Sequence, residues 1–513
     1  MFLRLMQVLF VLQVVIPSAG VVAQGLVPPS GAELQTTIAH LKWMAVPQAD
    51  QYELQIGLAG GSGDPFTSPL YSEITSSTSA VIDEGLEFGD ALIWRTRAYL
   101  NGVPDNWSEV SEFSIRTIPV GFPILVEANF GVSDPAMGLT LFNHCQSIVG
   151  YDLNGELQLL VDTPARVSDA RIISDGRLLC VGGGQAAMLD LMGQVIWKSP
   201  DSDDFRVHHC ASETPWGGVL MVVRDYREVT QDGVSRTWQG DRIVEMNPVT
   251  NEIVFDWSTF DHFSTDDYDV FQTNHWNDWT HINDAHIEPS DGRIWISVRH
   301  LSRITAIDYD TGEIAFNIGM ELPSGDVTVG DDLFSYQHSP MLLENGNLLL
   351  FDNGNRRGGE PVGADGYSRA VEIALEGDPP VSAKVVWSWE TPIYCPSTGD
   401  ADRLANGNTL VTSTQLSGMY EVDPKGNEVW HLDILNYETC PGLRPGYRAD
   451  RVPDIYFSLE ECIGDIDASG VVGVDDLLTL IAHWGGSGLG DVDESGTVGV
   501  DDLLIVLNAW GDC

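Results

Sequence analysis

A loosely repeated pattern between Phe122 and Leu459 limits what this 513-residue chain can fold into more than any other feature. Each copy begins with a turn and an apolar strand, continues with a strand that ends in a polar residue, and closes with a strand rich in aromatic residues. D-G, N-G, T-G and K-G pairs mark the tight reversals, where a positive φ favours glycine. The six copies cover residues 139–161, 175–198, 217–257, 291–319, 345–389 and 406–431.

Six small sheets arranged radially form a β-propeller, an architecture that leaves only short sheet edges and encloses a central channel. No long amphipathic helix interrupts the repeats. We therefore predict a mainly β chain with a six-bladed propeller over residues 119–459. In such a fold the innermost strands and the loops before them converge on one axis, so residues distant in sequence form one site.

The first 24 residues have the pattern of a secretory signal peptide. Arg4 precedes an apolar run, and small residues follow up to a plausible cleavage point at Ala23. The apolar core is too short to span a bilayer after processing, and no later segment is long and apolar enough. We expect an exported mature chain without a membrane span, located in the periplasm, at the cell surface or in the medium.

Residues 25–118 alternate apolar and polar positions in short runs, which predicts a small β-sandwich with Trp43, Tyr52 and Trp94 pointing inward. The stretch W-x-x-V-P-x-A-D-x-Y resembles the start of a fibronectin type III module. Both an interaction module and a simple spacer fit this resemblance.

The C-terminal segment, residues 460–513, contains a tandem repeat offset by 26 positions and no Lys or Arg from Cys462 onward. Oxygen-bearing side chains stand at loop positions one, three, five and twelve, Gly at six, and a backbone carbonyl fills position seven. Hard oxygen ligands at this spacing suit Ca²⁺. The predicted ligands are Asp465, Asp467, Ser469, Val471 and Asp476 in the first loop, and Asp491, Asp493, Ser495, Thr497 and Asp502 in the second.

This paired loop resembles a dockerin type I domain, an EF-hand-like α-helical calcium domain. The resemblance implies calcium-dependent folding and docking to a cohesin-like or cell-surface partner. The alternative is a calcium-stapled terminal domain that has no partner.

Charge and cysteine content narrow the partners and the compartment. The 26 basic and 75 acidic side chains give a net charge of −49, which argues against nucleic acid and anionic membranes as partners. Seven cysteines in an exported chain predict disulfides. We expect Cys462 to pair with Cys513 and Cys395 to pair with Cys440, with at least one thiol left unpaired among the other three.

Histidines recur at one position of three repeats. His281 precedes a strand that Arg299 closes, His338 stands at the matching place of the next unit, and His208 and His209 stand there two units before His338. A propeller directs that position toward the mouth of its channel. We therefore predict that these imidazoles and one guanidinium meet around one anion.

The segments W-T-H-I-N-D, S-V-R-H, Q-H-S-P and F-D-N-G resemble the bacterial arylsulfate sulfotransferase family of secreted six-bladed propellers. The resemblance implies that His338 is the nucleophile that becomes sulfated, and that His281 and Arg299 bind the sulfuryl group. It adds a histidine from the H-H motif, His208 or His209, of which we prefer His209. Cys210 stands where the family pattern has an Asp that would orient this ring.

The chemistry of these side chains agrees with those roles. A neutral imidazole nitrogen can hold SO₃ between two transfer steps, and a forked guanidinium suits an oxyanion. His281 and His209 can pass a proton to or from a phenol. Asn353, Arg356 and Arg357 either extend the anion site or, for the arginines, form ion pairs on an acidic surface, which is the interpretation we favour.

Two functions follow from the sequence. The first is an enzyme that moves a sulfuryl group from a phenolic sulfate to a phenolic acceptor through a sulfohistidine, without a nucleotide donor, since no Gly-rich phosphate loop precedes a helix. The propeller chemistry then needs no cofactor. The alternative is a non-catalytic propeller that binds a ligand and is displayed through its terminal modules. A metal site built from the histidines is disfavoured by the charge of Arg299.

Overall fold

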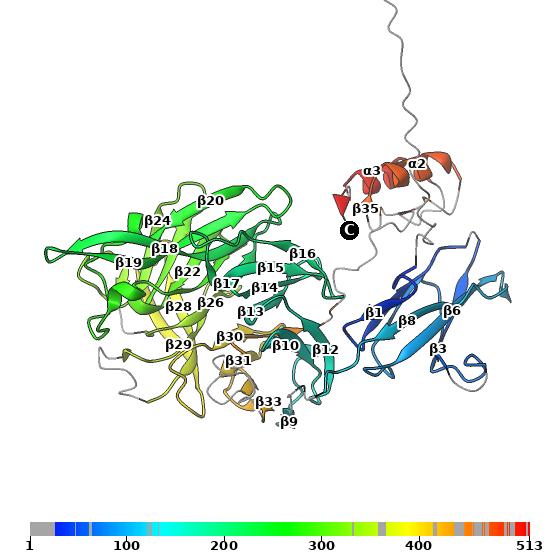
Figure 1. The fold of residues 1–513 in the computed structure, drawn as a ribbon, viewed down its shortest axis with the longest axis horizontal. Coiled ribbons are helices and arrows are strands. Elements are labelled where there is room, and N and C mark those ends of the chain that lie inside the picture. The colour runs from blue at the N-terminus through cyan, green and yellow to red at the C-terminus, as the bar shows by residue number, and fades with distance from the viewer. Residues whose placement is uncertain are drawn as a thin grey trace, which may run out of the picture.

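A computed structural model gives the fold of the chain (Figure 1). It describes residues 26–512 except for 47, 61–63, 121, 123–125, 132, 331–332, 358–365, 414–417, 436–445, 454, 456–463, 465, 467–470, 487–489, 491, 493–497 and 509–510. The predicted signal peptide lies outside these residues. The described chain is mainly β, as the repeats predict, and none of its helices has the length and apolar composition that a bilayer-spanning helix requires.

Two sheets form the N-terminal unit. The larger has the strand order β1-β8-β6-β3-β4 with β7 beside β6, and the smaller pairs β2 with β5. Trp43, Tyr52 and Trp94 lie in the buried core between them. The strands are β1 (Ala32–Leu34), β2 (Ala39–Lys42), β3 (Gln51–Leu58), β4 (Tyr71–Thr75), β5 (Ser79–Ile82), β6 (Ala91–Leu100), β7 (Val103–Pro104) and β8 (Ser111–Ile115). Membership of the fibronectin type III class stays a prediction.

Within the described residues, six further sheets of four or five strands follow, which we number in chain order. Sheet 1 contains β10 (Leu139–His144), β11 (Ser147–Tyr151), β12 (Leu157–Asp162) and β34 (Ala449–Val452). Sheet 2 contains β13 (Val167–Ile172), β14 (Leu178–Gly182), β15 (Gln185–Leu189) and β16 (Val195–Lys198). Sheet 3 contains β17 (Val207–Glu213), β18 (Val219–Gln231), β19 (Val234–Met246) and β20 (Ile253–Ser258).

The remaining sheets have the same antiparallel plan. Sheet 4 contains β21 (Ile282–Ile287), β22 (Arg293–Val298), β23 (Arg303–Asp308), β24 (Ile314–Gly319) and β25 (Val329–Gly330), of which β25 alone pairs in parallel. Sheet 5 contains β26 (His338–Leu342), β27 (Leu348–Asp352), β28 (Arg369–Glu376) and β29 (Ser382–Glu390). Sheet 6 contains β30 (Asp400–Arg403), β31 (Thr409–Ser413), β32 (Gly418–Val422), β33 (Glu428–Ile434) and β9 (Val126–Phe130).

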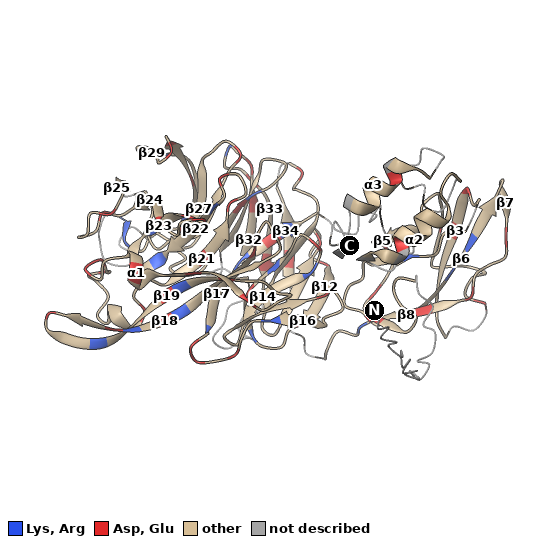
Figure 2. Ribbon diagram, turned by 90° about the horizontal axis from the view of Figure 1, so that it is seen from above, with Lys and Arg blue, Asp and Glu red and all other residues tan. Residues whose placement is uncertain are grey.

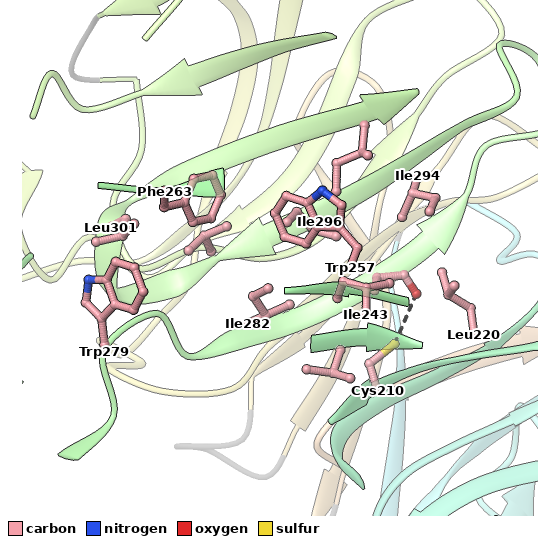
Figure 3. Packing of buried hydrophobic residues seen from close by; sticks show 14 of the residues in the cluster. Cys210, Leu220, Ile243, Trp257, Phe263, Trp279, Ile282, Ile294, Ile296 and Leu301 are labelled. Atoms are coloured by element: carbon pink, nitrogen blue, oxygen red, sulfur yellow. Dashed lines mark hydrogen bonds between the residues drawn. The ribbon is translucent and has the colours of Figure 1, made fainter. Parts of the chain in front are cut away.

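Buried apolar clusters join each sheet to the next. One of them combines Leu220 and Ile243 of sheet 3 with Ile282 and Ile296 of sheet 4, and Figure 3 shows these side chains interleaved. Another combines Leu160 of sheet 1 with side chains of sheet 6, so the series of sheets closes into a ring. Strands packed on both faces must be apolar at most positions, which explains runs such as that of β27.

The ring is closed by strands from both ends of its sequence. β34, the last strand, pairs with β10 and becomes part of sheet 1, while β9, the first, pairs with β33 at the edge of sheet 6. Each sheet at the junction therefore combines early and late segments of the chain, and neither can be completed before both are present.

The C-terminal unit contains α2 (Val474–Ala482), α3 (Val500–Asn508), β35 (Val471–Val472) and β36 (Gly511–Asp512), around a small core that includes Leu480 and Val506. Figure 2 marks acidic positions and no basic ones on the two helices. Asp476 and Asp502 are 1 % exposed, and each accepts a hydrogen bond from the backbone N–H three residues earlier. The other predicted calcium ligands lie outside the described residues, except for the backbone of Val471.

The cysteine predictions need one correction. Cys180, Cys210 and Cys395 are buried free thiols, so the predicted pairing of Cys395 with Cys440 is wrong. The Cys395 Sγ lies 3.2 Å from the Ser397 carbonyl oxygen in the loop that follows β29. Spacing along the chain misled the prediction because it carries no information on where a buried loop turns. Cys440, Cys462 and Cys513 lie outside the described residues.

Candidate active site

The sequence-predicted residues stand at corresponding ends of sheets 3, 4 and 5. His208 and His209 lie on β17, His281 immediately precedes β21, and His338 is the first residue of β26. Arg299 begins the short 3₁₀ helix η2 (Arg299–Leu301) at the end of β22. Because β17, β21 and β26 are the first strands of successive sheets, their starts lie at the same end of the ring.

Side-chain rings from separate sheets meet there. The His209 and His281 ring centroids are 4.5 Å apart, and those of His281 and His300 are also 4.5 Å apart. Tyr447, which precedes β34, connects His209 with His338. The centroid of its ring is 6.1 Å from that of His209 and 5.9 Å from that of His338. The predicted residues therefore form one group, and Tyr447 joins them.

The same backbone irregularity occurs at each of these strand starts. The pairing register shifts after Val207 in β17, after Ile282 in β21 and after His338 in β26. His209 has φ 59° and His281 has φ 51°, a left-handed conformation that is uncommon outside glycine. Bulges re-aim side chains, and strain of this kind gathers at functional sites. Here it brings imidazoles from separate sheets toward one another instead of leaving them in the regular alternation.

A neutral amide fixes the ring of His338. Its Nδ1 lies 2.6 Å from Oδ1 of Asn353, and the Asn353 amide nitrogen donates to the carbonyls of Cys395 and Thr398 at 2.7 and 2.8 Å. Those two bonds identify the Asn353 oxygen as the atom facing His338, so Nδ1 must carry the proton. The lone pair of His338 is then on Nε2. From the sequence alone, we considered Asn353 only as an extension of the anion site.

His281 has a carboxylate behind it. Its Nδ1 lies 2.5 Å from Oδ2 of Asp278, a residue three positions earlier in the loop after the 3₁₀ helix η1 (His275–Asn277). The neighbouring His300 holds the same loop, because its Nδ1 lies 2.6 Å from the Asp278 carbonyl oxygen. This orients the Nε2 of His281 away from Asp278 and toward the group of rings.

The paired histidines divide into an inner and an outer ring. His209 faces His281 and Tyr447, whereas Nε2 of His208 lies 3.0 Å from Oδ1 of Asp241 on β19. Cys210 stands where the arylsulfate sulfotransferase pattern has Asp, and it is buried against β21. Its Sγ lies 3.5 Å from the Ala285 carbonyl oxygen, the contact dashed in Figure 3. A carboxylate therefore does lie beside the pair, but it comes from β19, two strands away in the same sheet.

Arg299 is held by three contacts. Its guanidinium donates to Nε2 of His300 at 2.9 Å and to the carbonyl of Pro396 at 3.0 Å, and it stacks on Tyr336 with 4.4 Å to the ring centroid. The bond from His300 to Asp278 leaves the acceptor nitrogen of His300 for Arg299. A guanidinium has five N–H donors, so others remain for an anion.

Three histidines of the site are uncharged at neutral pH. Burial, followed by positively charged neighbours that include Arg299, holds the pKa of His209, His281 and His338 well below the usual range of histidine. Burial also lowers the pKa of Arg299, although a guanidinium keeps its charge. The site thus combines one fixed cation with neutral imidazoles, which suits an anion that is attacked by a neutral nitrogen.

A second group of acidic and basic side chains surrounds a cavity close to these histidines. Arg448 donates to Asp284 at 2.5 Å, and this pair lines a cavity of about 490 Å³ together with Arg171, Asp400 and Asp450. Two groups have ligand atoms within 4.8 Å of one another, as a metal ion would require: Asp400, Asp402 and Asp450, and separately Asp278, His281 and His300. His300 of the second group already accepts from Arg299 through Nε2.

The remaining predicted residues support the site from outside. Arg356 pairs with buried Asp269 at 2.9 Å and Arg357 with buried Asp352 at 2.7 Å. The arginines do form ion pairs, but with interior carboxylates and not on an acidic surface. Asp269 also accepts a hydrogen bond from the Tyr336 hydroxyl, which links Arg356 to the wall beside Arg299.

Three residues at the site were not identified from the sequence: Asp241, Asp278 and Tyr447. Among the described residues no group hydrogen-bonds the hydroxyl of Tyr447, which is 6 % exposed. Burial raises the pKa of this phenol, so it stays protonated and can donate. A signal was available, because Tyr447 precedes β34, which holds the edge position in sheet 1 that β21, preceded by His281, holds in sheet 4.

Comparison with known proteins gives one family and several distant structural likenesses. A family model described as Arylsulfotransferase (ASST) matches residues 132–439, more than half of the chain. No curated protein matches. A protein of unknown function from Bacteroides caccae is 14 % identical, with 60 % of this chain and 97 % of that chain covered and a TM-score of 0.39.

Two other solved structures are similar at the same level. The Cps50 (Swd1) β-propeller domain of Myceliophteria thermophila is 11 % identical, covering 64 % of this chain and 90 % of that chain with a TM-score of 0.36. Virginiamycin B lyase from Staphylococcus aureus is 12 % identical, covering 61 % and 100 % with a TM-score of 0.29.

Proposed function

The chain belongs to the arylsulfotransferase (ASST) family, and from this premise we propose that it moves a sulfuryl group from a phenolic sulfate to a phenol through a sulfated His338. The observation that carries the proposal is the bond from His338 Nδ1 to Asn353, since it leaves the Nε2 lone pair as the nucleophile. Burial keeps this nitrogen unprotonated at neutral pH.

In the first half of the reaction, Nε2 of His338 forms a bond to sulfur as the bond from sulfur to the aryl oxygen breaks. The aryl oxide leaves with that electron pair and takes up a proton from solvent, to which the base of the second half-reaction later releases one. Arg299 meets the charge on the sulfuryl oxygens, with donors fixed by His300 and Pro396 so that little reorganisation is needed. His281 lies against His300 beside this cation and completes the set of groups proposed to bind the sulfuryl oxygens.

In the second half, the oxygen of a phenolic acceptor attacks sulfur, the N–S bond breaks, and its electron pair returns to His338. The acceptor must lose its proton to a nearby base, for which His209 and His281 are the candidates. A nucleotide donor has no role in this scheme.

The proposal includes the surroundings of the site. We infer that sheets 1–6 are the six blades of a propeller and that the chain is exported, with the unit around α2 and α3 folding on Ca²⁺ and docking to a cohesin-like or cell-surface partner. Asp476 and Asp502 would supply the last ligand of each loop. A non-catalytic binding propeller would bind phenolic sulfates without turnover.

Incubation with p-nitrophenyl sulfate and phenol tests the proposal. The wild type is expected to release nitrophenol in proportion to the phenyl sulfate formed, and His338→Ala to lose this activity. His431→Ala, a substitution of a half-buried histidine on β33, is the matched control and should retain it. Mass spectrometry after mixing with donor alone should find one SO₃ group on the peptide that contains His338. An inactive wild type, or an active His338→Ala, would contradict the proposal.

A further inference from the structure

Asp241 is a buried carboxylate that the reaction described above does not use. It is fully buried on β19, and among the described residues His208 is the only basic side chain in ion-pair contact with it. Its other oxygen, Oδ2, accepts from the Thr280 hydroxyl at 2.5 Å and from the Ile282 N–H at 2.8 Å. One carboxylate therefore contacts the residues on both sides of His281 as well as the outer histidine of the pair.

The bulge in β17 is what lets His208 and His209 act together. In a regular strand, successive side chains point to opposite faces. The register shift after Val207 and the φ of 59° at His209 bring the two rings to one side, with their Nδ1 atoms 2.6 Å apart. At that distance one proton lies between the two nitrogens.

The proton positions along this series follow from Asp241. Oδ1 of Asp241 lies 3.0 Å from Nε2 of His208, and an unprotonated nitrogen that close to a carboxylate oxygen would set two lone pairs against each other. We therefore assign the proton of His208 to Nε2, which leaves Nδ1 of His208 as an acceptor. The proton between the rings then belongs to Nδ1 of His209. This leaves the lone pair of His209 on Nε2, on the side of the ring away from His208.

We propose that Asp241 is a positioning residue that, through His208, makes Nε2 of His209 the base for the phenolic acceptor. The inference rests on the sulfuryl transfer proposed above. In the second half of the reaction the phenol O–H bond breaks as its proton moves to Nε2 of His209, the new O–S bond forms, and the N–S bond returns its electrons to His338. The positive charge that His209 gains is shared with His208 and balanced by Asp241, as in a histidine oriented by a buried aspartate.

Asp241→Asn tests this division of roles because the amide has one defined orientation. Thr280 and Ile282 both donate to Oδ2, so the amide oxygen must stay there and the amide N–H₂ must face His208. That donor forces the proton of His208 from Nε2 to Nδ1. Nδ1 of His209 then has to accept, and Nε2 of His209 becomes a donor that cannot take the phenol proton.

The experiment separates the two half-reactions in the full-length chain. Sulfated enzyme is formed with p-nitrophenyl sulfate, followed by the burst of nitrophenol, and is then mixed with either phenol or a polyfluorinated phenol that is already ionised at the assay pH. We expect Asp241→Asn to keep the burst and the transfer to the ionised acceptor, and to slow transfer to phenol by about a hundred-fold or more.

His208→Gln serves as the second variant should the buried amide prevent folding, since it removes the relay while leaving Asp241 unchanged; the same dependence on acceptor is expected. Asp278→Asn, which alters the carboxylate behind His281, should slow both acceptors equally. An equal loss with both acceptors in Asp241→Asn, or acceptor dependence in Asp278→Asn alone, would overturn the proposal. Absence of a burst in the wild type would instead reject the sulfuryl transfer on which it rests.

Discussion

The amide oxygen of Asn353 lies 2.6 Å from Nδ1 of His338, and the amide nitrogen of Asn353 is bonded to the loop that follows β29. The ring orientation of His338 is therefore set by two sheet 5 strands and that loop together. An amide here, in contrast to the carboxylates behind His208 and His281, fixes the tautomer without adding negative charge.

This contact predicts the effect of Asn353→Ala. Without the amide, either nitrogen of His338 can carry the proton, and the ring loses its fixed orientation. The rate of the first half-reaction should fall on the order of a hundred-fold or more, with the protein still folded. Asn355→Ala is the control, because Asn355 holds Pro396 of the same loop at 2.9 Å, and it should cost far less. Burst kinetics with p-nitrophenyl sulfate compare the two; similar losses would count against the tautomer argument.

The low pKa values of the histidines predict the response to acid. Free histidine titrates at about pH 6.5, and burial holds His209, His281 and His338 well below it. The acid limb of kcat/KM for the donor should therefore lie below about pH 6.5. An acid limb above that pH would contradict the assignment of neutral, buried rings.

Stability should change in the same range for a related reason. Below about pH 6.5 the unfolded chain binds protons that the buried rings do not, so the free energy of unfolding falls as the pH is lowered. It stops falling only below the depressed pKa values of the folded state. Denaturant midpoints at several pH values should show this slope, and His338→Asn should reduce it.

A buried ion pair that includes none of the reacting groups predicts a strong effect on stability. Arg303 and Asp267 are both fully buried and 3.1 Å apart. Asp267→Ala leaves the guanidinium without its partner, which costs about 3–5 kcal/mol. The exposed pair of Arg227 and Asp261 is the control, where Asp261→Ala should cost no more than about 1 kcal/mol. Thermal melting of both variants measures the difference; equal shifts would show that burial is not decisive here.

Calcium should act on the C-terminal unit alone. Asp476 and Asp502 are buried at the starts of α2 and α3, at the twelfth position of each predicted calcium loop, where a carboxylate would supply the last ligand. In the full chain, removing Ca²⁺ with a chelator should speed hydrogen exchange in α2 and α3 and leave sheets 1–6 unchanged. Mg²⁺ should restore protection poorly. Exchange that is insensitive to chelator would contradict the predicted loops.

The sequence was most informative where chemistry follows from position in a repeat. Strand starts that matched between units identified His281, His338 and the paired histidines, and the structure does bring these rings together. Asp241 could not be found in this way, because it lies in the third strand of its sheet, and only the β17 bulge turns His208 toward it. A bulge has no reliable signature in residue type.

The sequence was also a poor guide to which side chains from different sheets contact each other. From the sequence we expected Arg356 and Arg357 to form ion pairs on an acidic surface. Both pair instead with interior aspartates, one of them in the loop before His275. Cys395 was assigned a disulfide from its separation from Cys440, but is a free thiol. Both errors have the same origin, since distances between sheets depend on how the ring closes, and that is not encoded in spacing along the chain.

The interlocking of β9 with β33 and of β34 with β10 has a consequence for how the chain can be rearranged. The two ends of the ring sequence finish in adjoining sheets, so a short linker could connect them and new termini could be opened in a surface turn elsewhere, such as that at Gly292. Such a circular permutant would keep every histidine in its sheet. Deleting either end strand, by contrast, would bare a β edge that a second chain could pair with.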